Sequence, residues 1–261
     1  MSYDWNFSKR LDALNLKKPI YENIVLGNSL AMDGINSTLL SSDSNSTYNL
    51  SIGGASLKTN YIQLQDYLEI TNKKPKRVLL GIASYRKSFF KEEIHPIVQF
   101  TNSDYKYNLT DIPMIKFKWI FKELIKKIIS IEHRDARVVQ GQLRIRKTIP
   151  DKTQQNKIIK GIPFEKYKKS KSLVDIVSLC NQNNIELILI EMPGFRNTRN
   201  NEDVGPYVIN YNQTTAVKLY NFNGPDIDLI LDPQTDWLGA SHLNETGARK
   251  FTKFISHYIF K

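Results

Sequence analysis

A serine and a histidine stand in the two sequence contexts that could support acyl-transfer chemistry. Ser29 follows Gly27 and Asn28 in the run YENIVLGNSLAMDGIN, directly after a short apolar stretch. A serine that ends a strand turn and begins a helix lies beside free backbone N–H groups and the positive end of the helix dipole, and both stabilise an oxyanion. The same context is typical of an ordinary helix N-cap, so Ser29 alone does not identify a nucleophile.

His242 lies in DWLGASHLNETGARKF, a polar loop in front of a C-terminal helix that Asn244 could cap. A loop of this kind at the carboxyl edge of a sheet can supply the base for a nucleophilic serine. A lone loop histidine is equally typical of a surface or structural residue. His95, His133 and His257 have weaker contexts, in front of a proline, at a charged helix end and on the terminal helix.

The elements around Ser29 alternate between strand and helix. Residues 21–27, 47–54 and 76–84 read as short buried strands, and helical patterns follow Ser29 and occupy residues 55–72. Such an alternation predicts βαβ units and a parallel sheet with helices on both faces. We therefore expect a three-layer α/β/α fold.

The C-terminal part of the chain continues the pattern. A helix is expected over 172–184, another buried strand over 185–195 and a closing helix over 245–260. The single cysteine, Cys180, falls on the apolar side of a helical pattern and is expected to be a small buried residue. The core face of the closing helix should comprise Ala248, Phe251, Phe254, Ile255 and Tyr258.

Residues 88–170 interrupt this rhythm and read as an inserted cap, lid or docking region within one domain spanning 1–261. One amphipathic helix is expected over 114–131, followed by a polar and poorly periodic stretch. The net charge of +11 is concentrated here, because residues 115–172 hold 17 Lys/Arg against 5 Asp/Glu. This excess indicates a solvated basic face, or a surface for an anionic glycan, a lipid headgroup or an acyl-carrier protein. Nucleic acid is the least favoured partner, because the aromatic residues of this stretch fit helix packing.

The composition excludes several other classes of protein. One cysteine allows no intrachain disulfide, and neither metal-ligand spacing nor a glycine-rich nucleotide motif occurs, so no metal and no cofactor are expected. No segment reaches the roughly 18 apolar residues of a membrane helix. We expect a soluble protein that is cytoplasmic or peripheral to a membrane, or extracytoplasmic if a signal or anchor precedes it.

Three blocks of the sequence resemble the SGNH/GDSL hydrolase superfamily: GNSLAMDGIN, YNLSIGGAS and SHLNETGARKFT. They resemble most the DltD-like and alginate-acetylation-like proteins that modify surface glycans, and the likeness covers residues 21–86 and 225–260. It implies a flavodoxin-like sheet, Ser29 as nucleophile and His242 as base. It also implies that Asn28 and the Gly53 and Gly54 amides face the oxyanion or the substrate.

The sequence departs from the family pattern at three positions. Asn28 replaces the family aspartate, and Ser84 ends a block that usually carries an oxyanion-binding asparagine. Gly239 stands where the triad acid is expected, three residues before the histidine. Asp236 is the nearest acid upstream and could orient His242 if the loop doubles back. A backbone carbonyl, or another acid such as Asp232 or Glu245, is the alternative.

Two functions follow from this interpretation. The first is a serine esterase or O-acyltransferase, acetyl by resemblance, that acts on a carbohydrate or polysaccharide hydroxyl through an acyl-serine intermediate. Its partners would be the acylated glycan and, through residues 115–172, an acyl-donor protein or an anionic membrane surface. The second is a catalytically impaired binding or scaffold protein of the same fold for an anionic glycan or lipid surface.

Overall fold

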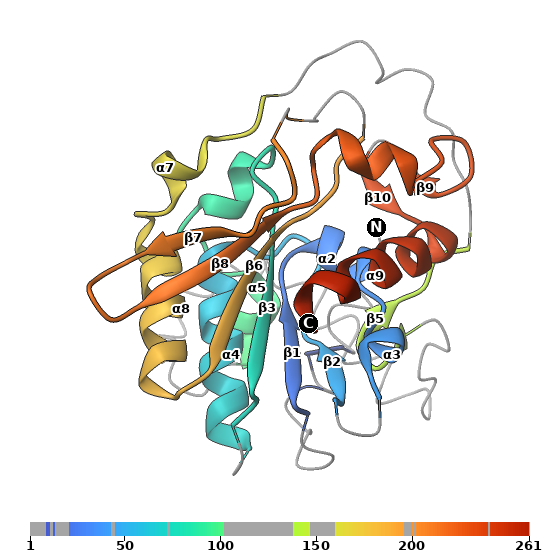
Figure 1. Ribbon diagram of the computed structural model, residues 1–261. Coiled ribbons are helices and arrows are strands. Elements are labelled where there is room, and N and C mark those ends of the chain that lie inside the picture. Colours follow the sequence, from blue (N-terminus) through green and yellow to red (C-terminus); the bar gives the residue numbers. More distant parts are fainter. Residues whose placement is uncertain are drawn as a thin grey trace, which may run out of the picture.

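The computed structural model describes residues 9–10, 13, 21–42, 45–71, 74–101, 138–146, 160–195, 200, 202–239 and 241–260. Six strands form the central sheet (Figure 1). They are β1 (Asn23–Leu26), β2 (Thr47–Asn49), β3 (Arg77–Ile82), β6 (Glu186–Glu191), β7 (Tyr207–Asn210) and β8 (Ala216–Asn221). Two hairpins lie outside it, β4 (Val138–Val139) with β5 (Gln142–Leu143) and β9 (Trp237–Leu238) with β10 (His242–Leu243).

The helices are mostly short. They are α2 (Ser29–Gly34), α3 (Ser37–Leu40), α4 (Leu57–Ile70), α5 (Pro96–Thr101), α7 (Phe164–Tyr167), α8 (Lys171–Gln182) and α9 (Glu245–Ile259), with 3₁₀ turns η1 (Lys87–Phe90) and η4 (Pro225–Leu229). None of the helices in these described ranges is long and apolar enough to cross a membrane.

The strand order is β2-β1-β3-β6-β8-β7, and all neighbours are parallel except β7, which pairs antiparallel with β8. The first five strands have the order of a flavodoxin-like sheet. The strands stay parallel, but the direction in which successive strands are added to the sheet reverses between β1 and β3. Ligands bind at such a switch point, outside the carboxyl ends of the strands. Ser29 follows β1 and therefore stands at this point.

Successive residues of the buried strands face opposite layers, which produces two apolar cores. Ile24 and Leu26 of β1 pack with α4 and α8 on one side, and Val25 packs with α2 and α9 on the other. The three-layer α/β/α prediction is confirmed. The prediction that Cys180 is buried is also confirmed, because it is 1% exposed. The predicted core face of α9 is confirmed as well: Ala248, Phe251 and Ile255 are buried, and Phe254 and Tyr258 are partly buried.

Two predictions about the elements need correction. The β7–β8 hairpin was not expected, and it makes the sheet mixed rather than wholly parallel. The expected helix after Ser29 is two short helices, because Asn36 begins a new one by accepting a hydrogen bond from Leu39 N. The helix expected over 114–131 lies outside the described residues. The assignment of 88–170 as an insertion stays a prediction.

Candidate active site

The turn that carries Ser29 is built by a close approach between β1 and α2. A Cβ on Gly27 would lie 2.6 Å from the Cβ of Ala31, so only glycine lets the helix pack this tightly against the strand. Asn28 caps α2, because its Oδ1 accepts a hydrogen bond of 2.9 Å from Leu30 N. Ser29 is consequently the first helical residue and not the N-cap, and its side chain is free to point to a partner.

Ser29 and His242 meet, as the resemblance implied. The distance from Ser29 Oγ to His242 Nε2 is 3.5 Å, although the two residues are 213 positions apart in the chain. Ser29 is half-buried and His242 is 9% exposed. This length is a loose hydrogen bond of the kind that nucleophile–base pairs show before substrate binds.

The acid beside His242 is Asp33 and not Asp236. His242 Nδ1 lies 2.7 Å from Asp33 Oδ2, and the Asp33 side chain is 1% exposed. Asp33 is four residues after Ser29 on α2, so both project from one face of the helix. The imidazole therefore bridges a hydroxyl and a carboxylate from the same helix, which is the arrangement of a nucleophile, base and orienting acid.

Asp236 has a different task. Its Oδ2 accepts hydrogen bonds of 2.7 Å from Asp232 N and from Lys250 Nζ, and its carbonyl oxygen accepts one of 3.0 Å from Asn244 N. The loop does double back, with Gly239 at a φ of +70°, but the turn brings Asp236 beside Asn244 rather than beside the ring. The prediction that Asp236 orients His242 is thus corrected, and neither Asp232 nor Glu245 replaces it.

The geometry of this loop explains two residue types of the HLNETG segment, Asn244 and Gly247. Asn244 Oδ1 accepts a hydrogen bond of 3.0 Å from Gly247 N and so caps α9, as expected. A Cβ on Gly247 would lie 2.2 Å from the Asp236 carbonyl oxygen, which excludes any other residue there. The segment therefore fixes the position from which His242 reaches α2.

The acid is electrostatically unusual. Burial raises the pKa of Asp33, and the hydrogen bond from His242 and the charges of His242 and Lys9 oppose that rise. Asp33 Oδ1 has no hydrogen-bond partner in the described part of the chain. Lys9 was not anticipated. It is buried, donates to the carbonyl oxygen of Ser51, and its pKa is lowered to about 7 by desolvation, against the pull of Asp33.

The expected oxyanion donors lie on the neighbouring loop. Ile52 N donates a hydrogen bond of 3.3 Å to Gly27 O, so Gly53 and Gly54 follow directly beside the Ser29 turn. Gly54 has a φ of +82° and lies against the buried ring of His95, whose pKa burial lowers to about 4. The oxyanion roles of both glycines stay predictions, and the structure gives the Asn28 amide oxygen a capping task instead.

Ser84 lies at the position where the family that the sequence resembles carries an oxyanion-binding asparagine. Both hydrogen-bond donors of Ser84 already have an acceptor. Its backbone N–H and its hydroxyl donate to Glu191 Oε1 at 2.9 and 2.7 Å. Two residues further along, Arg86 is exposed, and its guanidinium donates a hydrogen bond to Ser241, the neighbour of His242.

Segments of the expected insertion also contact the site. Gln142 of β5 donates to Asp33 O at 3.2 Å, and Ile145 O accepts from Glu245 N at 2.7 Å. Within the ranges that the structure describes, no three His, Cys, Asp or Glu side chains gather as a metal site would require.

Asp33 could have been found in the sequence. It lies inside the GNSLAMDGIN block, and its spacing of four from Ser29 on an expected helix is the signal that was missed. No sequence pattern singled out Lys9.

Comparison with known proteins adds a distant structural likeness. No family model matches the chain, and no curated protein matches it. Among solved structures, one described as "The structure of a putative platelet activating factor from Streptococcus pneumonia" aligns with a TM-score of 0.45 and 12% identity, covering 98% of this chain and 90% of that one. The fold assignment therefore rests on the strand order and strand pairing of the sheet.

Proposed function

We propose that this chain is an SGNH-type serine esterase or O-acyltransferase that acts on a carbohydrate or cell-surface polysaccharide hydroxyl. The observation that carries the proposal is the continuous chain of contacts from Ser29 through His242 to the buried Asp33. These three side chains stand at the switch point of a flavodoxin-like sheet, where such folds bind ligands.

The proposed reaction follows from this geometry. Ser29 Oγ attacks the acyl carbonyl while its proton passes to His242 Nε2, and Asp33 stabilises the resulting imidazolium. The Ser29 N–H and the Gly53 or Gly54 N–H groups receive the oxyanion. The leaving alcohol takes the proton from His242, which leaves an acyl-Ser29 ester. Water then releases the acid in a hydrolase, and a sugar hydroxyl accepts the acyl group in a transferase.

The glycan substrate comes from the sequence resemblance, and the charge at the rim supports an anionic one. Arg86 is held next to His242 by its contact with Ser241, and it forms no ion pair with any described carboxylate. An acyl-donor protein or an anionic membrane surface stays the proposed partner of residues 115–172. Of that stretch, the structure describes 138–146 and 160–172.

The test is labelling by a fluorophosphonate, which requires an activated hydroxyl. We expect one labelled site at Ser29, and we expect Ser29→Ala to lose both labelling and ester turnover. Its melting temperature should change by only a few degrees, because Asn28 and not Ser29 caps the helix. An unlabelled but folded wild-type chain would instead favour the binding or scaffold protein. A fully active Ser29→Ala variant would remove Ser29 from the mechanism.

A further inference from the structure

His95 lies against the loop after β2 whose amides are proposed to receive the oxyanion. It directly precedes α5 in the chain. Ile94 and Val98, on either side of it, pack with Ile52 and Ala55 in a small apolar cluster. The segment that carries His95 is therefore held on this loop by apolar packing.

The first turn of α4 joins His95 to the turn that carries Ser29. Thr59 Oγ1 accepts a hydrogen bond of 2.8 Å from His95 N. At the next position of the helix, Asn60 Oδ1 accepts a hydrogen bond of 2.8 Å from Gly27 N, two residues before Ser29. Thr59 and Asn60 are both fully buried. The backbones of His95 and of the Ser29 turn are thus fixed by adjacent side chains of one helix.

One edge of the His95 ring is a free donor. Nδ1 accepts a hydrogen bond of 3.3 Å from Ile97 N, which places the ring proton on Nε2. Nε2 has no hydrogen-bond partner in the described part of the chain, and unlike Asp33 Oδ1 it is not sealed from solvent. A Cβ on Gly54 would lie 3.7 Å from His95 Cδ2 and 3.9 Å from Nε2, so this edge of the ring faces the loop. A ligand beside Gly54 can therefore meet the Nε2–H group.

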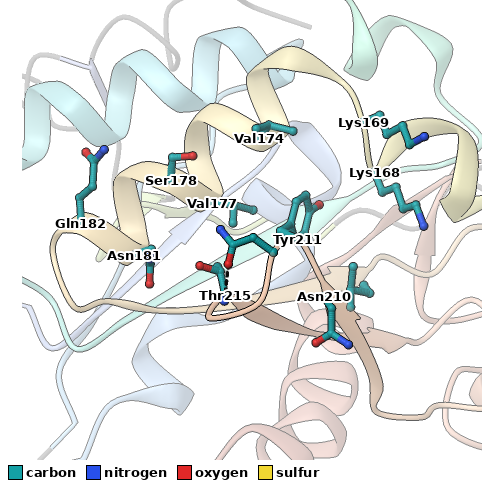
Figure 2. Close-up of a pocket in the computed structure, with 12 residues that line it drawn as sticks. Lys168, Lys169, Val174, Val177, Ser178, Asn181, Gln182, Asn210, Tyr211 and Thr215 are labelled. Carbon is teal, nitrogen blue, oxygen red and sulfur yellow. Dashed lines mark hydrogen bonds between the residues drawn. The ribbon is translucent and has the colours of Figure 1, made fainter.

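This edge of the ring is remote from the cavity at the other side of the sheet. That cavity, of about 500 Å³, lies between α8 and the β7–β8 hairpin (Figure 2), and neither His95 nor Gly54 lines it. The hairpin strand β7 and the strand β2 are at opposite edges of the sheet (Figure 1). A ligand that meets His95 Nε2 is therefore a ligand of the loop after β2.

Burial keeps the His95 ring neutral. Desolvation lowers the pKa of His95 to about 4, so at neutral pH the ring carries a single proton. A neutral imidazole can donate a hydrogen bond to a developing oxyanion. It adds no positive charge, which would oppose protonation of the His242 ring during the reaction.

One oxyanion donor of the family pattern does not come from Ser84, because both donors of Ser84 go to Glu191. We propose that His95 supplies this donor, with its Nε2–H hydrogen-bonded to the acyl oxygen that the Gly53 or Gly54 amide also receives. The inference rests on the proposed function, because it adds a residue to the same site. His95 transfers no proton and forms no covalent bond in this role.

The experiment compares His95→Phe with His95→Gln in ester turnover and in the rate of fluorophosphonate labelling, each per folded molecule. Phenylalanine keeps a ring without a donor, and the glutamine amide can place an N–H near the position of Nε2. We expect His95→Phe to lower kcat by about 10²–10³-fold, the effect of losing one oxyanion donor, with little change in KM. His95→Gln should regain about tenfold or more of that loss.

Labelling of Ser29 should slow in the same order, because the phosphonyl oxygen takes the place of the oxyanion. His95→Leu is a second variant without a donor and should behave as His95→Phe does, so the comparison with glutamine does not depend on the folding of one variant. His257→Phe, at an exposed position of α9, is the control and should change neither turnover nor labelling.

Equal losses in the phenylalanine, leucine and glutamine variants would show that the ring only supports the loop, and would overturn the inference. So would full kcat in His95→Phe, or a loss confined to KM. These results leave the proposed function standing as long as Ser29 of the wild type is labelled. A folded wild type that is not labelled would contradict the esterase itself, and the donor role of His95 with it.

Discussion

At the residue scale, the two aspartates near the histidine loop make opposite contacts, and this allows a matched pair of variants. Asp33 touches the imidazole, whereas Asp236 touches a lysine and the backbone of its own loop. Both are buried, so a general effect of losing a buried carboxylate should appear in both variants. Only loss of the charge beside the ring is specific to Asp33.

We expect Asp33→Asn to lower ester turnover by about 10⁴-fold, the cost of the equivalent change in the serine-protease template. Without the anion, the imidazolium that forms during the reaction is no longer stabilised, so the loss should appear in turnover. The measurement is kcat/KM for a p-nitrophenyl ester.

The control is Asp236→Asn, which should lower the melting temperature because Lys250 loses its buried partner. It should leave turnover per folded molecule unchanged. If Asp236→Asn lowered turnover and Asp33→Asn did not, the assignment of the orienting acid would be reversed.

The sequence identified Ser29 and His242 because each lies in a short block whose residue types are tied to a turn. It misplaced the acid because the position of Asp236 depends on how the loop through Gly239 folds back. The fold of this loop decides whether Asp236 lies beside His242 or beside Asn244, whose N–H donates to the Asp236 carbonyl oxygen, and local residue types do not determine that fold. The i, i+4 spacing of Ser29 and Asp33 is visible in the sequence, but it indicates a shared site only once the His242 ring is known to lie between them.

At the element scale, α2 is too short to be stable alone, since an isolated helix of six residues does not overcome the cost of nucleation. Asn49 at the end of β2 holds it in place. Asn49 Nδ2 donates to Ala31 O and Ile35 O at 2.9 and 3.1 Å, and Oδ1 accepts from Ser51 N at 3.0 Å. One buried amide thus links the helix that carries two site residues to the sheet.

Replacing Asn49 with Leu should remove the side-chain hydrogen bonds to Ile35 O and from Ser51 N, and one of the two bonds to Ala31 O, and so destabilise the fold by about 1–3 kcal/mol. It should also lower turnover well beyond the fraction of unfolded chain, because Ser29 and Asp33 shift together relative to His242. Denaturant unfolding and turnover per folded molecule measure the two effects. Asn23→Leu is the matched control. Asn23 is as buried as Asn49, lies at the end of β1 that is away from Ser29, and donates a side-chain hydrogen bond to Thr47. It should cost stability but preserve turnover, and equal losses of turnover would contradict the role given to Asn49.

The strands differ in how clearly the sequence predicts them. β1, β3 and β6 are continuous apolar runs covered on both faces, and such runs are predictable. β7 was missed because it is an edge strand with three of its four residues exposed, so its side chains carry little apolar signal. β8 alternates between exposed and buried positions in its first half and has no turn glycine before it.

At the scale of the whole molecule, Glu191 should make stability depend on pH. It is fully buried at the end of β6, and desolvation raises its pKa to about 8, against the hydrogen bonds from Ser84. The folded chain therefore holds a proton that the unfolded chain releases near its ordinary pKa of about 4.3. This contribution is complete below the unfolded pKa and is lost as the pH rises through about 8.

We expect Glu191→Gln to flatten the fall in melting temperature between about pH 5 and 8, because glutamine keeps the acceptor for Ser84 without titrating. The lowered pKa of Lys9 acts in the opposite sense from about pH 7 upward, so the difference between variant and wild type isolates Glu191. Glu186→Gln, at the exposed start of the same strand, should keep the wild-type slope. An unchanged slope in Glu191→Gln would show that the carboxyl is ionised in the folded chain.

The separation of the three site residues along the chain has a consequence for synthesis. Ser29 and Asp33 lie within one helical turn of each other, but His242 follows Asp33 by 209 positions. At about 5–20 residues per second, the ribosome needs roughly 10–40 s to add His242 after Ser29 and Asp33 are made. Under the proposed mechanism, the nascent polypeptide carries an unactivated serine throughout that interval, so we expect neighbouring acyl esters not to react with it until translation has passed the histidine.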